Sequence, residues 1–377
     1  MQKRARKPSQ KTVAVFFGGR SNEAEISVIT GMYAVNLLRG TAFRVLPVFL
    51  PPEGGMRCGN WRKVSEFAGD VGGVSVTFVQ GGLARCGKMR RSERIDVALN
   101  CCHGGMGEDG TLAALLAWYG IPSASPGVPE SALFMDKALT KIALAGLGIA
   151  AAPAFCVTER AFAAAPEETY ARAAAFGYPV VVKPARLGSS IGLTVVHGEE
   201  MLSDALSLAF TLDDKALIER YFPDKRDVNC AACRCGDEVR VSACEEVFSG
   251  GELLSYAEKY EAGKGSQCPA DLPERVTDRI RSDTRRLYEA FGMHGVVRAD
   301  YLVAGDAVYF NELNTVPGSL AGYLFADTLA GIRRFFTELL EEALRNPPVQ
   351  KTVIRTGILR ESVFSGAKGC KRRGNFV

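Results

Sequence analysis

The sequence lacks the features of a membrane protein and of one common class of nucleotide-binding protein. The uncharged stretch 142–157 is rich in Ala and Gly, contains Pro153 and falls short of the ~20 apolar residues that a transmembrane helix requires. The apolar TVAVFF behind the basic N-terminus is too short for the core of a signal peptide. No G-x-x-x-x-G-K-[ST] is present, which excludes a P-loop, and no internal repeat is present. We therefore expect a cytoplasmic protein with no membrane partner.

The chain also lacks a basic body, although its formal net charge is +4. Residues 1–11 carry five positive charges and no negative one, and residues 351–377 carry seven positive charges and one negative. The remainder therefore has a net charge of −7. Basic ends of this kind are more often solvated than functional, so we expect no nucleic-acid partner.

The eleven cysteines do not form the framework of a small disulfide-rich protein, because the chain has 377 residues and the cysteines are spread along it. The clusters Cys101-Cys102 and Cys230/Cys233/Cys235 suggest a reducing compartment. A zinc site at the second cluster would lack a fourth ligand nearby and would have unusual spacing. Buried strand thiols are the alternative interpretation that we favour.

Short apolar segments followed by Gly-rich turns and helical segments predict an α/β fold. TVAVFF (12–17) precedes GGRSNEAE, and IDVALNCC (95–102) precedes HGGMGEDG and a helix, as in a parallel sheet covered on both faces. A helix is predicted over 131–148, and a boundary near Pro223. We expect three units between a basic extension and a basic tail, with these ranges: 1–11 (extension), 12–130, 131–223, 224–350 and 351–377 (tail).

The stretch NELNTVPG (311–318) follows a predicted hairpin formed by RADYLV and AVYF. If Ala304 lies opposite Val308, Asp300 faces Glu312 and Arg298 faces Asn314; a two-residue loop would separate them. Two opposed carboxylates require a positive charge between them, and oxygen ligands suit Mg²⁺. A solvated polar face on an edge hairpin is the alternative.

Three further motifs are ambiguous by themselves. In VVVKPARLGSSIG, Lys183 and the following Gly-Ser loop could bind phosphate or form an ordinary turn. In HGGMGEDGT, Gly105-x-Gly107-x-x-Gly110 has the form of a dinucleotide fingerprint, but Glu108 and Asp109 would repel a pyrophosphate and equally suit the cap of the next helix. In GGRSNEAEIS, Glu23 or Glu25 could bind an ammonium group or occupy a first helical turn.

In this order, the motifs resemble those of the D-alanine–D-alanine ligases, a family of the ATP-grasp superfamily. The resemblance covers roughly residues 12–345 through GGRSNEAEIS, HGGMGEDGT, MDK, YPVVVKPARLGSSIG, EKY, RAD and NELNTVPG. It implies a three-domain ATP-grasp fold, with an N-terminal Rossmann-like domain and two lobes that clamp ATP. It also implies a homodimer that forms D-alanyl-D-alanine for peptidoglycan precursors through a D-alanyl phosphate, releasing ADP and phosphate.

The resemblance assigns roles to particular residues. It implies two Mg²⁺ ions, replaceable by Mn²⁺, on Asp300, Glu312 and Asn314. The implied ATP-binding residues are Lys137, Lys183, Ser190, Glu219, Asp227 and Lys259, and the implied catalytic residues are Glu23, Ser189, Tyr260 and Arg298. Substrate binding is assigned to Glu23, His103, Arg298 and Gly318. Gly318 leaves room for the second amino acid.

The sequence departs from the family pattern at a few positions. Tyr323 stands where the family has a serine for the second carboxylate, and the hinge ERYFPDKRDV has an irregular length around Asp227. The alternative functions are a D-alanine–D-lactate or D-alanine–D-serine ligase, an ATP-grasp binding protein without turnover, and a nicotinamide oxidoreductase using Gly105–Gly110.

Overall fold

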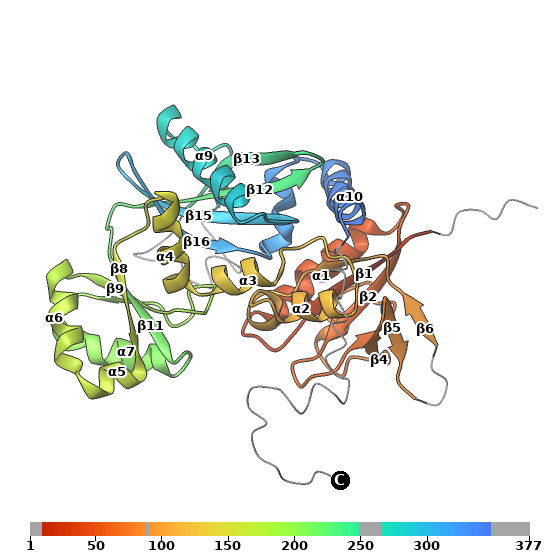
Figure 1. The fold of residues 1–377 in the computed structure, drawn as a ribbon, viewed down its shortest axis with the longest axis horizontal. Coiled ribbons are helices and arrows are strands. Elements are labelled where there is room, and N and C mark those ends of the chain that lie inside the picture. Colours follow the sequence, from red (N-terminus) through yellow and green to blue (C-terminus); the bar gives the residue numbers. More distant parts are fainter. Residues whose placement is uncertain (1–9, 88–90, 249–264, 348–377) are drawn as a thin grey trace, which may run out of the picture. The chain divides into compact units, whose positions relative to one another are not determined.

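A computed structural model describes residues 10–87, 91–248 and 265–347. These residues belong to one compact unit, which ends at Pro347. They form three β-sheets, and each of the three expected segments contributes one sheet (Figure 1). The domain boundaries themselves remain a prediction. Within the described ranges, no helix combines the length and apolarity that crossing a membrane requires.

The first sheet has seven strands in the order β6-β5-β4-β3-β2-β1-β7. Only β1, β2 and β7 run parallel; the other strands extend the sheet in antiparallel fashion, which the sequence analysis did not predict. The strands are β1 (Thr12–Gly18), β2 (Arg44–Leu50), β3 (Arg57–Cys58), β4 (Val74–Val79), β5 (Gly82–Arg85), β6 (Ser92–Arg94) and β7 (Val97–Asn100).

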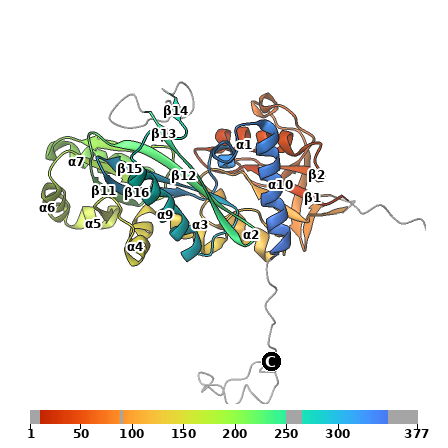
Figure 2. The ribbon, with the colours of Figure 1, turned by 90° about the horizontal axis from the view of Figure 1, so that it is seen from above.

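Both faces of this sheet are buried at β1 and β7, as their apolar sequences predicted. Along β1, Val13, Val15 and Phe17 pack with α1 (Ala24–Leu38) and with α10 (Leu329–Arg345). The alternate residues Ala14 and Phe16 pack with α2 (Thr111–Trp118) on the opposite face. The last helix of the unit therefore covers the first sheet, and Figure 2 shows α10 beside α1.

The second sheet has four antiparallel strands in the order β10-β9-β11-β8. Its members are β8 (Ala154–Thr158), β9 (Val180–Pro184), β10 (Thr194–Val196) and β11 (Lys215–Arg220). The helices α5 (Glu159–Ala164), α6 (Pro166–Phe176) and α7 (Leu202–Phe210) supply side chains to its core. β9 is an inner strand, between β10 and β11, and it is buried along its whole length up to Lys183 and Pro184.

The third sheet has the order β14-β13-β12-β15-β16. Its strands are β12 (Arg226–Cys235), β13 (Glu238–Val247), β14 (Ser266–Gln267), β15 (Val296–Ala304) and β16 (Ala307–Asn314). One face packs with α3 (Val128–Met135), α4 (Lys137–Leu147) and α9 (Glu274–Ala290), and the other face packs with α10. The short 3-10 helices are η1 (Val64–Phe67), η2 (Gly105–Gly107), η3 (Glu199–Met201) and η4 (Gly318–Leu324).

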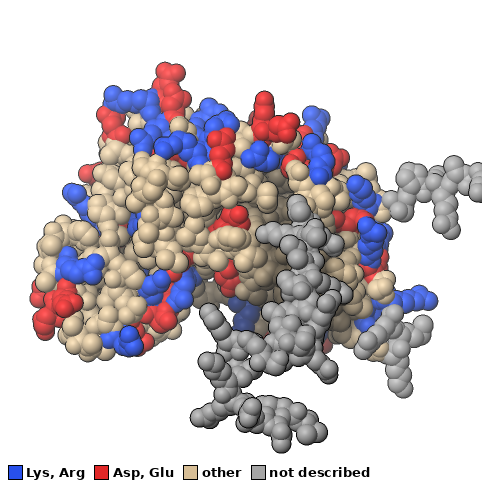
Figure 3. Space-filling view, in the orientation of Figure 1, with Lys and Arg blue, Asp and Glu red and all other residues tan. Residues whose placement is uncertain are grey.

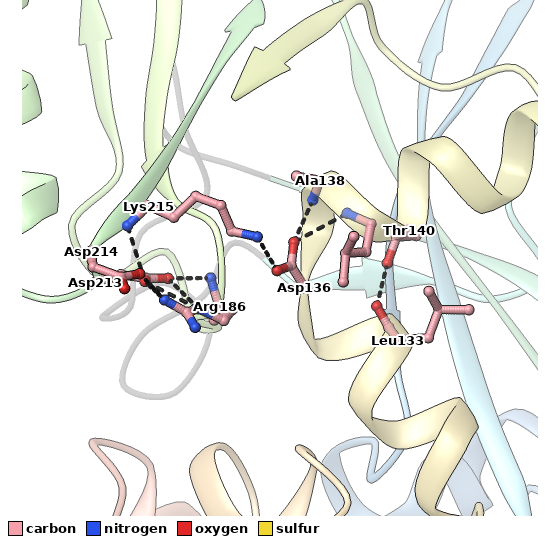
Figure 4. Close-up of polar contacts among 9 residues, drawn as sticks. Leu133, Asp136, Ala138, Thr140, Arg186, Asp213, Asp214 and Lys215 are labelled. Carbon is pink, nitrogen blue, oxygen red and sulfur yellow. Dashed lines mark hydrogen bonds and ion pairs between the residues drawn. The ribbon is translucent and has the colours of Figure 1, made fainter. Parts of the chain in front are cut away.

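The single helix predicted over 131–148 is wrong, because α3 and α4 are separate and meet at Asp136. The carboxylate of Asp136 accepts hydrogen bonds from the backbone N–H groups of Ala138 and Leu139, which caps α4. The same carboxylate pairs with Lys215 of β11 (Figure 4). The new helix therefore begins with Lys137 at a fixed position beside the second sheet.

Acidic and basic side chains are interspersed over the described part of the face drawn in Figure 3. This mixed pattern differs from the basic stripe with which proteins follow a nucleic-acid backbone.

Candidate active site

A cavity of about 640 Å³ gathers residues from the second and third sheets and from the segments that follow β1 and β7 of the first sheet. Every described residue to which the family resemblance assigned a role lines it: Glu23, His103, Lys137, Lys183, Ser189, Ser190, Glu219, Asp227, Arg298, Asp300, Glu312, Asn314 and Gly318. The remaining two, Lys259 and Tyr260, lie outside the described residues. Segments up to 295 residues apart thus meet at one place, as a composite site requires.

The β15–β16 hairpin brings the two carboxylates together by a route that the sequence analysis did not predict. Its loop has two residues, since Ala304 pairs with Ala307, yet Asp300 still lies opposite Glu312 and Arg298 opposite Asn314. A β-bulge restores this register, because Tyr301 pairs with Phe310 and leaves residue 311 extra. The expected pairing is confirmed, whereas the expected loop, with Ala304 opposite Val308, is wrong.

The bulged residue, Asn311, also contributes to the cavity. Its amide oxygen accepts a hydrogen bond from Lys183 Nζ at 3.2 Å. Bulges re-aim side chains in this way, and here the bulge links the third sheet to the second. Asn311 was missed because a bulge leaves no clear mark in a single sequence.

Each acid of the hairpin has a cation beside it. Arg298 contacts both oxygens of Asp300, at 2.7 and 2.8 Å, and Asn314 Nδ2 donates to Asp300 at 3.0 Å. Lys137 Nζ lies 3.2 Å from Glu312 Oε2. These opposed carboxylates are thus held in a site rich in positive charge, and they do not form a solvated edge.

A second cluster joins Lys183 to Glu219 and to Lys141. Lys183 Nζ is 3.1 Å and Lys141 Nζ 2.8 Å from the Glu219 carboxylate, which is only 2% exposed. Burial alone would raise the pKa of Glu219, but the two ammonium groups outweigh it and hold the pKa below its ordinary value. Burial lowers the pKa of Lys141. Sequence reasoning missed Lys141, whose only signal is its place one helical turn after Lys137.

The Gly-Ser loop after β9 reaches back to the first sheet. The Ser189 hydroxyl donates to the Glu23 carboxylate, and both side chains are buried. Ser189 and Ser190 have φ values of +54° and +58°, a left-handed conformation that non-glycine residues rarely adopt. At Gly104, where φ is +65°, a Cβ would lie 2.6 Å from Glu23 Oε2, so this position requires glycine.

The motif HGGMGEDGT supplies three buried or capping groups. The ring Nε2 of His103 lies 2.8 Å from Thr30 Oγ1, and burial lowers the pKa of His103 to about 4, which keeps the imidazole neutral. Asp109 caps α2 through the N–H of Thr111 at 2.8 Å, as expected.

Glu108 does not cap α2, contrary to expectation. Its two oxygens accept from the backbone N–H groups of Gly104, at 2.7 Å, and Val316, at 3.0 Å. Burial, reinforced by the charge of Glu23, raises the pKa of Glu108 to about 7. Glu108 therefore ties the loop of His103 to the turn that follows the hairpin, and it lines the cavity.

At the end of the cavity near Gly318, the Tyr323 hydroxyl donates to Glu245 Oε2 at 2.9 Å, and Asn229 Nδ2 donates to the same oxygen at 3.1 Å. Burial raises the pKa of Tyr323 above its ordinary value, so it remains a phenol. The sequence analysis found Tyr323 but not its partner on β13. In the hinge, Asp227 forms an ion pair with Lys225.

The zinc interpretation of Cys230, Cys233 and Cys235 is not supported. No group of three His, Cys, Asp or Glu side chains in the described ranges is arranged to hold a metal ion. Cys230 and Cys233 are buried thiols on β12, and all ten described cysteines are free.

Comparisons with known proteins agree on one family. The model described as "D-ala D-ala ligase N-terminus" matches residues 12–126, and "D-ala D-ala ligase C-terminus" matches residues 143–343. The chain is 34% identical to a D-alanine–D-alanine ligase of Chlorobium chlorochromatii, over 89% of this chain and 98% of that protein. It is 33% identical to one of Deinococcus radiodurans, over 89% of this chain and 99% of that protein.

Two solved structures have similar folds. The D-alanine–D-alanine ligase of Helicobacter pylori aligns with a TM-score of 0.70 and 27% identity, over 91% of this chain and all of that one. The VanG D-Ala:D-Ser ligase of Enterococcus faecalis aligns with a TM-score of 0.74 and 26% identity, over 90% of this chain and all of that one.

Proposed function

Because the chain belongs to the D-alanine–D-alanine ligase family and has its α/β ATP-grasp fold, we propose that it joins two D-alanine molecules at the expense of ATP. The products are D-alanyl-D-alanine, ADP and phosphate, and the dipeptide serves peptidoglycan precursor synthesis. The single observation that carries the proposal is the convergence of thirteen expected residues on one cavity. A nicotinamide oxidoreductase has no comparable support.

The reaction has two steps. A carboxylate oxygen of the first D-alanine attacks the γ-phosphorus of ATP, ADP leaves, and a D-alanyl phosphate forms. The amine of the second D-alanine then attacks the carbonyl carbon, and phosphate leaves from the tetrahedral intermediate. Holding three substrates in one cavity can contribute about 7–11 kcal/mol through effective molarity.

The residues that would hold Mg²⁺ are Asp300, Glu312 and Asn314. Their fit rests on two hard carboxylates paired across the strands and an amide on the same wall of the cavity. Bound Mg²⁺ would neutralise phosphate charge. We propose two ions, replaceable by Mn²⁺.

The cations have distinct tasks in this proposal. Lys137 and Lys183 bind the phosphates of ATP. In the described structure they contact the carboxylates of Glu312 and Glu219, and phosphate oxygens replace these partners when ATP binds. Arg298 stabilises the oxyanion of the tetrahedral intermediate from its place beside Asp300. The other residues proposed to bind ATP are Ser190, Glu219, Asp227 and Lys259. For Lys259 this role rests on the sequence alone.

In this proposal the first D-alanine is oriented by residues that precede α1 and follow β9. The Glu23 carboxylate binds the ammonium group of this D-alanine, and the hydrogen bond from Ser189 holds the Glu23 side chain in position. A neutral His103 lines the same cavity and can act only as an uncharged partner near pH 7. Gly318 leaves space for the second amino acid, and Tyr260 remains a catalytic residue by resemblance alone.

The proposal includes a cytoplasmic homodimer. The ten described cysteines are all free, which supports a reducing compartment. The family resemblance supports the dimer. Analytical ultracentrifugation of the full chain tests it.

An acceptor assay tests the proposed function. ADP release should require D-alanine, fail with L-alanine, and yield a product with the mass of D-alanyl-D-alanine. D-Serine and D-lactate, offered at equal concentration with D-alanine, should be used less well. A preferred ester or D-seryl product would replace the proposal with the corresponding ligase, and D-alanine-independent ATP turnover would refute it.

A further inference from the structure

Two thiols at the far end of β12 lie outside the cavity and form a pair. The Cys233 and Cys235 sulfur atoms are 3.9 Å apart, on the same side of the strand. Cys233 is buried and Cys235 is half-buried, so only the second is open to reagents. Neither lines the cavity, and the proposed reaction uses neither.

A guanidinium group completes this site. Arg240 of β13 donates from Nη1 to Cys235 Sγ at 3.5 Å and contacts Glu338 of α10 at 2.9 Å. The other charged or titratable neighbours from the packed elements are Tyr288 of α9, Glu342 and Arg345 of α10. Among the described residues, Arg240 is thus the cation that contacts the Cys235 sulfur directly.

These contacts favour the thiolate of Cys235. The hydrogen bond from the Cys233 thiol and the contact with Arg240 lower the pKa of Cys235 to about 6, against the opposing effect of burial. The same hydrogen bond raises the pKa of Cys233. A thiolate is the nucleophilic form of cysteine, and accessible thiolates beside a second thiol are typical of redox-modified sites.

We propose that Cys235 is a reactive thiol that a hydroperoxide oxidises and that Cys233 then captures in a disulfide. In the first step the Cys235 thiolate attacks the terminal oxygen of the peroxide, the O–O bond breaks, and Cys235 becomes a sulfenic acid. The remaining alkoxide, or hydroxide in the case of hydrogen peroxide, leaves and takes up a proton from water. The Cys233 sulfur then attacks the Cys235 sulfur, its proton and the sulfenic hydroxyl leave as water, and the disulfide forms. Same-side Cα atoms of a strand lie about 6.6 Å apart, near the upper limit for a disulfide, so the bond forms only when Cys235, the last residue of β12, shifts toward Cys233.

A second pair on the same strands provides a natural control. Cys230 and Cys244 are paired across β12 and β13, but both are buried, so the proposal predicts that they resist the same reagents.

Alkylation tests the reactivity of Cys235. The full chain would carry Cys86→Ser, Cys268→Ser and Cys370→Ser, which removes the two exposed thiols and one outside the described residues. Iodoacetamide should then modify Cys235 at pH 6.5, and Arg240→Gln should slow this about tenfold, with Arg240→Lys restoring much of the rate. Equal rates in all three proteins would overturn the proposal.

Trypsin digestion tests the disulfide. Cleavage after Arg234 separates the peptide of Cys233 from that of Cys235, so a disulfide should join DVNCAACR to CGDEVR after treatment with equimolar hydrogen peroxide. In Cys233→Ser the link should vanish, and dimedone should instead trap a sulfenic acid at Cys235. A parent protein that yields the dimedone adduct and no linked peptide would contradict the role of Cys233.

Discussion

At the scale of the residue, the site depends on the carboxylate of Glu312. It lies opposite Asp300 and 3.2 Å from Lys137, so it joins the hairpin to the start of α4. Its loss should affect the charge of the site more than the fold, because its side chain lines the cavity and does not belong to an apolar core.

We predict that Glu312→Gln lowers D-alanine-dependent ADP release by about 100-fold or more, a loss of the size seen when one group that stabilises transition-state charge is removed. The thermal midpoint should remain unchanged. Glu341→Gln, at an exposed position of α10, is the matched control and should retain full turnover. An active Glu312→Gln enzyme would remove Glu312 from the proposed metal site.

Glu108 should make stability depend on pH. Its pKa rises from 4.5 in the unfolded chain to about 7 in the folded protein, so the folded state binds the extra proton between these values. The resulting stabilisation is complete below about pH 4.5 and is lost as pH rises through about 7.

Urea unfolding of the parent protein and of Glu108→Gln, from pH 4.5 to 8, measures this effect. As pH rises over this range, the unfolding free energy of the parent protein should fall by roughly 1–3 kcal/mol relative to that of Glu108→Gln. Glu341→Gln, at an exposed position of α10, is the control carboxyl. A difference that stays constant across this range would mean that Glu108 titrates normally.

Residue types and spacing were sufficient to identify most of the lining of the cavity, because Glu312, Asn314, Lys183 and Gly318 belong to local motifs. Partners from distant segments were not predictable. Lys141, Glu245 and the bridging role of Glu108 depend on which helix or strand lies opposite, and a single sequence does not specify that.

At the scale of the element, the bulge of β16 decides where the acids point. The hairpin was predictable from its alternation and its Gly-Asp turn, but a bulge depends on strand twist and on the neighbouring sheet. The break between α3 and α4 has a similar origin, because Asp136 caps α4 and pairs with Lys215 of another sheet.

Two changes at position 311 should separate the effect of the bulge from the effect of the Asn311 side chain. Asn311→Ala keeps the extra residue and removes the contact with Lys183, so it should raise the KM for ATP several-fold and leave kcat nearly unchanged. Deletion of Asn311 leaves Glu312 opposite Asp300 but removes the bulge and the local twist that it gives to β16, so it should misalign the two carboxylates and lower kcat by at least about tenfold. Equal kinetics in the two variants would show that the bulge itself has no orienting role.

At the scale of the whole molecule, the fold class was predictable because apolar strands alternate with helices and Gly-rich turns. Its long-range features were not. The packing of α10 from the end of the unit against α1 near its start follows from complementary apolar faces in space.

The described unit ends at Pro347, and the basic tail follows it in the sequence. We predict that a chain ending at Pro347 retains the kcat, KM and thermal midpoint of the full chain, because residues 10–347 contain the described core clusters and the described cavity. Removing α10 as well, by ending the chain at Thr328, should prevent folding. A large loss of turnover in the first truncation would assign the tail a role.

Isotope transfer tests the central claim, that this cavity lets a D-alanine carboxylate take the γ-phosphoryl group of ATP. With D-alanine labelled with ¹⁸O in both carboxylate oxygens, mass spectrometry of the released phosphate reports the bond that was made and broken. We predict one ¹⁸O atom in each phosphate. Phosphate without label, formed at the same rate as ADP, would show that water attacks ATP and would contradict the proposed function.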